Sequence, residues 1–156
     1  MKTGELIELI NSLVEEGADI SFDRKVTRDE EADWLGEQLA RMEKGNKFIL
    51  LAEVDGKIVA NSSITKGERY SKHVGDLGIA IRNGFRDVGI GTEMLKNLIS
   101  QAEKIGLKML TLTVFSTNKR AKHVYEKVGF KETGRKPKFI YKNGEYIDEV
   151  IMAKEI

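Results

Sequence analysis

The sequence predicts one domain of the α/β (α+β) class over residues 1–156: a mixed central sheet around a parallel βαβ unit, an N-terminal helix pair and a C-terminal β-hairpin. Three observations support this prediction. The 156 residues are 40% hydrophobic and contain no linker or repeat, which suits one core. The turn dipeptides Asp55-Gly56 and Asn143-Gly144 each lie between β-prone runs. A strand, a helix and a strand follow one another within residues 74–115.

The first part of the chain is predicted to form two helices and a hairpin. Apolar residues at helical spacing indicate a first helix that ends at Gly17. A capping box at Thr27 begins a second helix, which ends at Gly45. Residues 47–54 and 57–64 are the β-prone runs of the first hairpin.

The middle of the chain is predicted to be the βαβ unit. Residues 74–82 form a third strand, and apolar residues at helical spacing run from Ile90 to a closing Gly106. Residues 109–115 are rich in Thr, Val and Leu and form the next strand. Because a crossover helix joins them, the two strands are expected to be parallel, with a right-handed connection.

The last part of the chain is predicted to be a helix and a hairpin. Asn118 caps the helix and Gly129 ends it. Residues 138–142 and 146–153 are the two strands that turn at Asn143-Gly144.

Composition excludes several classes of protein. The absence of cysteine excludes disulfides, thiolate nucleophiles and Cys-based zinc sites, and two isolated histidines give no pattern for a metal, so we predict none. No apolar run approaches the ~20 residues that span a bilayer, and the start of the chain is not a signal peptide, so we predict a cytoplasmic protein. A net charge of +1 disfavours a protein that coats nucleic acid.

Charge is distributed unevenly along the chain. Residues 1–55 carry 7 basic and 14 acidic side chains, whereas residues 116–145 carry 9 basic and 3 acidic ones. These segments are either solvated faces or a cation-accepting end and an anion-accepting end. Four acids between the two N-terminal helices make a cationic ligand the natural guess for the first segment: Glu15, Glu16, Asp19 and Asp23.

The segment from Arg86 to Thr92 is the most informative. It lies between a strand and a helix, where unpaired N–H groups and the helix dipole favour an anion. Gly89 and Gly91 let an oxyanion approach the backbone. A dinucleotide fingerprint would need glycine at Met94, and a Walker loop would need a lysine before the threonine. The alternatives left are another kind of phosphate loop or a glycine-rich turn without a ligand.

Two motifs together carry a resemblance to a known family. Arg86-x-x-Gly89-x-Gly91 resembles the pyrophosphate-binding signature of the GNAT superfamily of acetyl-CoA-dependent N-acetyltransferases. Residues 118–130 resemble that family's second signature, with these residues in register: Asn118, Ala121, Tyr125, Gly129 and Phe130. The family usually begins with a β-strand, whereas this sequence opens on the first helix.

The resemblance implies a binding site for acetyl-CoA at the splayed end of the parallel strands. The backbone of Ile79, Ala80 and Ile81 would meet the pantetheine arm, Asn118 would touch it, and Ala121 would leave room beside it. The N–H groups that would bind the pyrophosphate belong to Arg86, Asp87, Val88, Gly89, Ile90, Gly91 and Thr92. The basic residues from Lys119 to Lys142 are either a landing surface for the 3′-phosphate or a solvated face.

Acetyl transfer to an amine requires a neutral nucleophile. An amine with a pKa of about 10.4 costs roughly 4.6 kcal/mol to deprotonate at pH 7, so a nearby carboxylate is useful. Asp76 is our candidate base, because Asp is depleted in strands and this one alternates with Leu77 and Ile79. The alternative is an edge-strand charge that points at water.

Tyr125 is the second catalytic candidate. On its spacing alone it is a core aromatic, since it shares a helical stripe with Ala121, Val124 and Val128. The resemblance implies instead that its hydroxyl lies beside the thioester sulfur and protonates the leaving thiolate.

We therefore predict an N-acetyltransferase that transfers acetyl from acetyl-CoA to a primary, cationic amine by direct attack on the thioester. The alternative is a GNAT-like module that senses acetyl-CoA without turnover. The expected partner is a small-molecule or peptide amine, with no nucleic acid and no membrane, and a homodimer is left open. Polyamines, aminoglycosides, protein N-termini and lysine side chains all fit.

Overall fold

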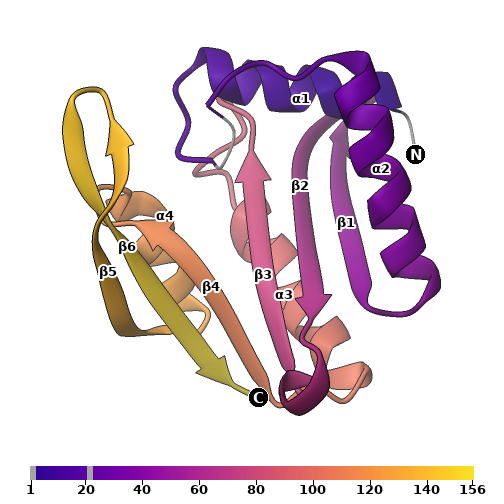
Figure 1. The fold of residues 1–156 in the computed structure, drawn as a ribbon, viewed down its shortest axis with the longest axis vertical. Coiled ribbons are helices and arrows are strands. Elements are labelled where there is room, and N and C mark those ends of the chain that lie inside the picture. Colours follow the sequence, from indigo (N-terminus) through magenta and orange to yellow (C-terminus); the bar gives the residue numbers. More distant parts are fainter. Residues whose placement is uncertain (1–2, 21–22) are drawn as a thin grey trace.

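A six-stranded sheet of order β1-β2-β3-β4-β6-β5 runs through the protein (Figure 1). The structure is a computed structural model that describes residues 3–20 and 23–156. Helices α3 and α4 cover one face of the sheet, and α1 and α2 lie toward the other (Figure 1). The elements are α1 (Thr3–Glu15), α2 (Arg28–Glu43), β1 (Lys47–Val54), β2 (Lys57–Lys66), the 3₁₀ turn η1 (Arg69–Ser71), β3 (Val74–Ile81), α3 (Ile90–Lys104), β4 (Met109–Phe115), α4 (Lys119–Lys127), β5 (Lys131–Lys142) and β6 (Glu145–Glu155). The predicted fold class is confirmed.

The parallel pair β3 and β4 is joined only at its beginning. The paired residues run from Val74 and Met109 to Asp76 and Thr111, although β3 continues to Ile81. Beyond that pair the strands diverge (Figure 1). The predicted parallel connection is confirmed, and the carboxyl ends of its strands are left apart.

Local signals place most element ends where the sequence predicts them. Thr27 Oγ1 accepts a hydrogen bond from the Glu30 N–H at 3.2 Å, and the Glu30 carboxylate accepts one from the Thr27 N–H at 2.9 Å, which completes the capping box. Asn118 Oδ1 accepts a hydrogen bond from the Ala121 N–H at 3.2 Å and so caps α4. At the second hairpin, Asn143 and Gly144 both have positive φ, as a tight two-residue turn requires.

Strand β5 differs from the prediction because it begins at Lys131 rather than at residue 138. Its register with β6 shifts between Lys136 and Ile140, where Pro137 and Lys138 form a bulge. Lys138 has a φ of 52°, and its N–H is bonded to Asp148 Oδ1 at 3.0 Å rather than to the ladder. An edge strand tolerates proline at such a bulge, which is why the strand continues through a sequence that reads as a break.

Two apolar clusters hold the layers together. The larger one joins α3 and α4 to the sheet, with Leu98, Leu110 and Phe130 fully buried. The smaller one joins α1 to α2 and β2 through side chains that include Leu6 and Leu35. No helix among residues 3–20 and 23–156 is long and apolar enough to cross a membrane.

The side chain of Glu31 is buried, unlike most charged side chains of α2. Its side chain is only 2% exposed, and neither carboxylate oxygen has a hydrogen-bond partner among the described residues. Burial raises the pKa of Glu31 to about 7. The folded protein therefore holds this proton more tightly than the unfolded chain, so stability falls as the pH rises from the unfolded pKa through about 7.

Glu31→Gln is expected to stabilise the protein in mildly alkaline solution. At about pH 8.5 the gain should approach 3 kcal/mol, because the amide removes the cost of an ionised buried carboxylate, and most of it should be gone at about pH 5. Denaturant melts at the two pH values measure it, with Glu37→Gln on the exposed side of α2 as the control. Equal responses of both variants would contradict the assignment.

Candidate active site

The segment between β3 and α3 folds back on the end of β3. Gly84, Asp87 and Gly89 have φ of 88°, 61° and 87°, all in the left-handed region, which bends the chain into a tight loop. Arg86 Nε donates a hydrogen bond to the Ile81 carbonyl at 2.9 Å and ties the loop to the strand. Gly89 precedes α3 and offers no side chain to cap it, so the N–H groups of the first turn remain available to an anion.

The two glycines of the motif have different surroundings. A Cβ on Gly89 would meet no atom within 4 Å, so this glycine is required by its positive φ. A Cβ on Gly91 would lie 2.9 Å from Ile81 Cδ1, so this glycine faces β3. This position of α3 therefore packs close to the end of β3, and the expectation that Gly91 leaves the backbone open to an oxyanion stays a prediction.

The first turn of α4 lies beside the loop. Arg120 Nε is 3.3 Å from Asp87 Oδ2, an ion pair that joins the second sequence signature to the first. Asn118 uses its side-chain oxygen to cap α4, which leaves its amide nitrogen for a ligand. The structure thus brings together the end of β3 (Ile79, Ala80 and Ile81), the loop from Arg86 to Thr92, and the α4 start with Asn118 and Ala121.

Tyr125 belongs to the larger apolar cluster and is 8% exposed. Its ring meets that of Phe130 edge to face, with the centroids 6.3 Å apart. Burial raises the pKa of Tyr125 to about 12, so the phenol keeps its proton at neutral pH. The packing predicted from its spacing is confirmed, and the same burial suits a proton donor.

Asp76 lies where β3 and β4 separate. It is the last β3 residue paired with β4, and Thr111 Oγ1 donates a hydrogen bond to its carboxylate at 3.1 Å. Burial raises the pKa of Asp76, while Thr111 and the charge of Lys47 lower it. Since β3 pairs with β2 as well as β4, Asp76 does not lie on an edge strand, although its side chain is exposed as that alternative expected.

A row of side chains crosses the sheet through Asp76. Direct cross-strand partners lie on one face, so Lys47, Thr65, Asp76 and Thr111 point to the same side of β1, β2, β3 and β4. Burial lowers the pKa of Lys47, as does the nearby charge of Arg41, whereas Asp76 raises it. A cation and a carboxylate therefore face the same region, which the sequence analysis did not identify.

The acids expected to line a cationic groove mostly have partners within the protein. Glu15 pairs with Lys25, and Glu16 pairs with Arg86 of the loop. Lys142 Nζ is 2.6 Å from Asp19 Oδ1 and donates to the Gly17 carbonyl at 2.6 Å. Three of these four acids therefore have partners within the protein, and their role toward a cationic ligand stays a prediction. Glu16 fastens the α1–α2 connection to the loop and Asp19 fastens it to the β5–β6 hairpin, whereas Glu15 pairs within the N-terminal part of the chain.

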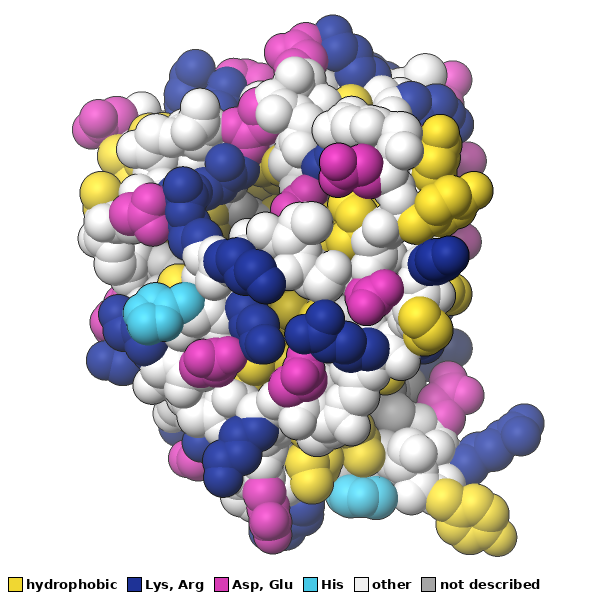
Figure 2. Space-filling view, turned by 90° about the vertical axis from the view of Figure 1, so that its left-hand side faces the viewer, with side chains coloured by type: hydrophobic (Ala, Val, Ile, Leu, Met, Phe, Trp, Pro, Cys, Tyr) yellow, Lys and Arg dark blue, Asp and Glu magenta, His cyan; other side chains and the backbone are white. Residues whose placement is uncertain are grey.

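The basic stretch of α4 and β5 is mixed with acids. Figure 2 shows Lys and Arg side chains gathered on the face that carries these elements, with Asp and Glu between them. Its ion pairs join Lys122 and Arg135 to Glu132, Arg135 to Asp148, and Lys136 to Glu149. Within this basic stretch, Arg120 contacts the loop from Arg86 to Thr92 through its ion pair with Asp87. Its guanidinium could therefore also bind a phosphate held by that loop.

Several known proteins are similar to this chain in sequence and in structure. The model of the acetyltransferase (GNAT) family matches residues 9–130. The L-amino acid N-acetyltransferase AaaT of Escherichia coli is 32% identical over 107 residues, which are 67% of this chain and 66% of AaaT, just under two thirds of its length. A GNAT-family acetyltransferase of Streptococcus pneumoniae superposes with a TM-score of 0.85 at 31% identity, over 99% of this chain and 94% of that one.

The fold is also shared with a protein solved with its cofactor. The yncA protein of Salmonella typhimurium, determined with acetyl-CoA, has a TM-score of 0.84 at 22% identity and covers 98% of this chain and 87% of its own. The family model covers more than half of the chain and includes both signatures. The chain belongs to the acetyltransferase (GNAT) family.

Proposed function

We propose that this protein transfers the acetyl group of acetyl-CoA to the amine of a small amino acid, by direct attack of the neutral amine on the thioester. The observation that carries the proposal is the divergence of β3 and β4 after Asp76 and Thr111, between the anion loop and the start of α4. An extended pantetheine arm can pair with the free backbone of β3 beyond that point. The pyrophosphate then reaches the loop that follows Ile81.

Asp76 is the proposed proton acceptor. The acceptor amine gives up a proton to the carboxylate, directly or through one water, and its lone pair then attacks the thioester carbonyl. The raised pKa of Asp76 makes it a stronger base than an ordinary aspartate, and its hydrogen bond with Thr111 holds it in place. The carboxylate is still reached by solvent, which allows the proton to leave.

Tyr125 is the proposed proton donor. The C–S bond breaks as the amide forms, and the departing thiolate takes the phenolic proton. Because the pKa of Tyr125 is raised to about 12, its phenol is almost fully protonated at neutral pH. The attacking nitrogen loses its second proton as the amide forms, and this proton reaches the phenolate through solvent. Asp76 releases the first proton to solvent, so both groups return to their starting states.

The proposed acceptor class rests on charge. Because three of the four N-terminal acids are paired internally, the argument for a polycation is weakened. Lys47, in the same row as Asp76 and with Arg41 close by, offers a positive charge to a carboxylate. AaaT is named for L-amino acids, a class that carries both an amine and a carboxylate.

Comparison of L-amino acids with their amides and with polyamines tests the acceptor class. We expect kcat/KM to be highest for amino acids, and to fall when the carboxylate is replaced by a neutral amide or when Lys47 becomes Gln. Equal rates for acids and amides would exclude Lys47 as a carboxylate partner. A preference for polyamines would restore the cationic acceptor.

Asp76→Asn is expected to lower turnover by at least about tenfold near pH 6.5, because the general base is lost. The loss should shrink toward about pH 9, where more of the acceptor amine is already neutral. The pH dependence of kcat/KM measures it, with Asp33→Asn on the exposed face of α2 as the control. A profile unchanged by Asp76→Asn would exclude Asp76 as the base.

A non-catalytic acetyl-CoA sensor, the alternative from the sequence, gains no support, since the relatives are named as transferases. A cytoplasmic location, a single domain over residues 1–156, the absence of nucleic-acid or membrane partners and a homodimer all stay predictions.

A further inference from the structure

A cavity of about 220 Å³ lies between α1 and α2, among residues that the acetyl-transfer chemistry does not use. Ile10 of α1 and Val26 of the connection form apolar walls, and Trp34 of α2 forms an aromatic one. Glu31 also lines the cavity. None of the residues proposed to bind acetyl-CoA or to move protons takes part in its lining.

The carboxylate of Glu31 is the unusual feature of the cavity. The side chain is only 2% exposed, and neither carboxylate oxygen has a hydrogen-bond partner among the described residues. An unpaired buried carboxylate is costly, and native proteins ordinarily supply such a group with donors. A donor brought by a ligand would remove that cost.

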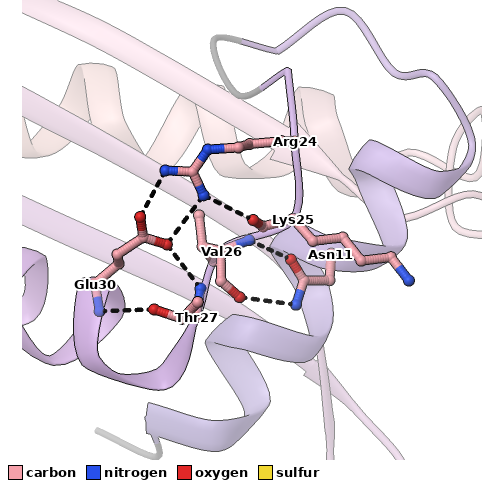
Figure 3. Close-up of polar contacts among 6 residues, drawn as sticks. All are labelled: Asn11, Arg24, Lys25, Val26, Thr27 and Glu30. Atoms are coloured by element: carbon pink, nitrogen blue, oxygen red, sulfur yellow. Dashed lines mark hydrogen bonds and ion pairs between the residues drawn. The ribbon is translucent and has the colours of Figure 1, made fainter.

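Arg24, the one cation among the described residues that line the cavity, is already engaged and cannot serve as that donor. Arg24 NH1 and NH2 bond the two oxygens of Glu30 at 3.1 and 2.6 Å, and NH1 also donates to the Lys25 carbonyl at 3.1 Å (Figure 3). Glu30 is further held by the Thr27 N–H. The guanidinium is therefore held by Glu30, beside the capping box of α2 (Figure 3).

The remaining charges favour a cation in the cavity. Among the described lining residues, Arg24 and Glu30 neutralise each other, which leaves the acids Glu31 and Asp23; Asp23 also lies near the charge of Arg24. A guanidinium or primary ammonium group carries several N–H donors and can satisfy both oxygens of Glu31. The face of Trp34 attracts cations, and the apolar walls suit a short alkyl chain.

We propose that this cavity binds a small organic cation, a guanidinium or primary ammonium group on a short apolar chain, at a site distinct from the acetyl-transfer site. The cation bonds Glu31, and the alkyl chain lies against Ile10, Val26 and Trp34. Because no cavity residue is part of the proposed catalytic machinery, binding does not require acetyl-CoA.

Trp34 is the only tryptophan of the chain, so its fluorescence reports on this cavity. Propylguanidinium and propylammonium titrated up to about 50 mM are expected to give saturable changes, since even millimolar affinity would be detected. Tetramethylammonium has no N–H donor for Glu31 and retains only the attraction of Trp34, so it is expected to bind much more weakly, and neutral propanol is expected to give no saturable change. Glu31→Gln should weaken binding about tenfold or more, whereas Glu37→Gln on the exposed face of the same helix should bind normally.

Calorimetric titration repeats the comparison without relying on fluorescence, and thermal melts confirm that each variant is folded. Saturable binding of the guanidinium that is lost in Glu31→Gln supports the site. Absence of saturation, equal binding by Glu31→Gln, or equal binding of tetramethylammonium would overturn it. Acetyl-CoA turnover should be unchanged in Glu31→Gln, so failure here leaves the proposed acetyl transfer untouched.

Discussion

Replacement of Tyr125 by phenylalanine is expected to lower kcat about a hundredfold or more, because general-acid assistance to a leaving group is typically of that size. The ring and its edge-to-face contact with Phe130 are kept, so the melting temperature should hardly move. The hydroxyl acts mainly in the transition state, so the KM for acetyl-CoA should change little. Steady-state kinetics and a thermal melt on the same preparation measure all three quantities.

Tyr70→Phe is the matched control, since Tyr70 is 99% exposed in η1 and loses the same hydroxyl. It should retain full turnover. If Tyr125→Phe also retains it, or loses activity only by unfolding, then Tyr125 is a packing residue and the thiolate takes its proton from another group.

Gly89→Val is expected to weaken acetyl-CoA binding about a hundredfold or more. Valine disfavours the φ of 87° found at this position, so the loop must change shape, and N–H groups that converge on the pyrophosphate move apart. Loss of two or three charge-assisted hydrogen bonds accounts for that factor. Equilibrium titration with acetyl-CoA, or the ligand-induced shift in melting temperature, measures it.

Gly106→Val separates loop shape from general destabilisation. Gly106 has a φ of 84° just beyond the end of α3. As at Gly89, a Cβ added at this position would meet no atom within 4 Å. Both variants should therefore lose about 1–2 kcal/mol of stability from the same backbone strain. Only Gly89→Val should lose acetyl-CoA binding, and normal binding by that variant would remove the loop from the cofactor site.

Local sequence signals predicted most of the fold. The glycines that end helices, the capping box at Thr27 and the two hairpin turns each act within a few residues, so the chain shows them directly. The start of β5 was missed because Gly134 and Pro137 read as a break. Pairing with β6 across a bulge, which a local pattern does not show, continues that strand.

The site was predicted where it follows a motif and missed where it depends on distant pairing. The loop and the start of α4 are recognisable because each is one continuous segment. The contacts of Glu16 with Arg86 and of Asp19 with Lys142 join residues 70 and 123 positions apart, so the acids appeared free in the sequence. Glu31 lies among the acids of the first turn of α2, which are usually exposed, and its burial is a property of the tertiary structure that the local pattern does not show.

Product analysis with the purified protein tests the central claim most directly. Acetyl-CoA is incubated with a panel of amino acids, amino-acid amides and polyamines, and free coenzyme A and acetylated amine are both quantified by mass spectrometry. We predict that the two products form in equal amounts with at least one small amino acid. In Tyr125→Phe, the rates at which both products form should fall to a small fraction of the normal rates. Saturable binding of acetyl-CoA without acetylation of any amine in the panel would contradict the account and favour a sensor of acetyl-CoA.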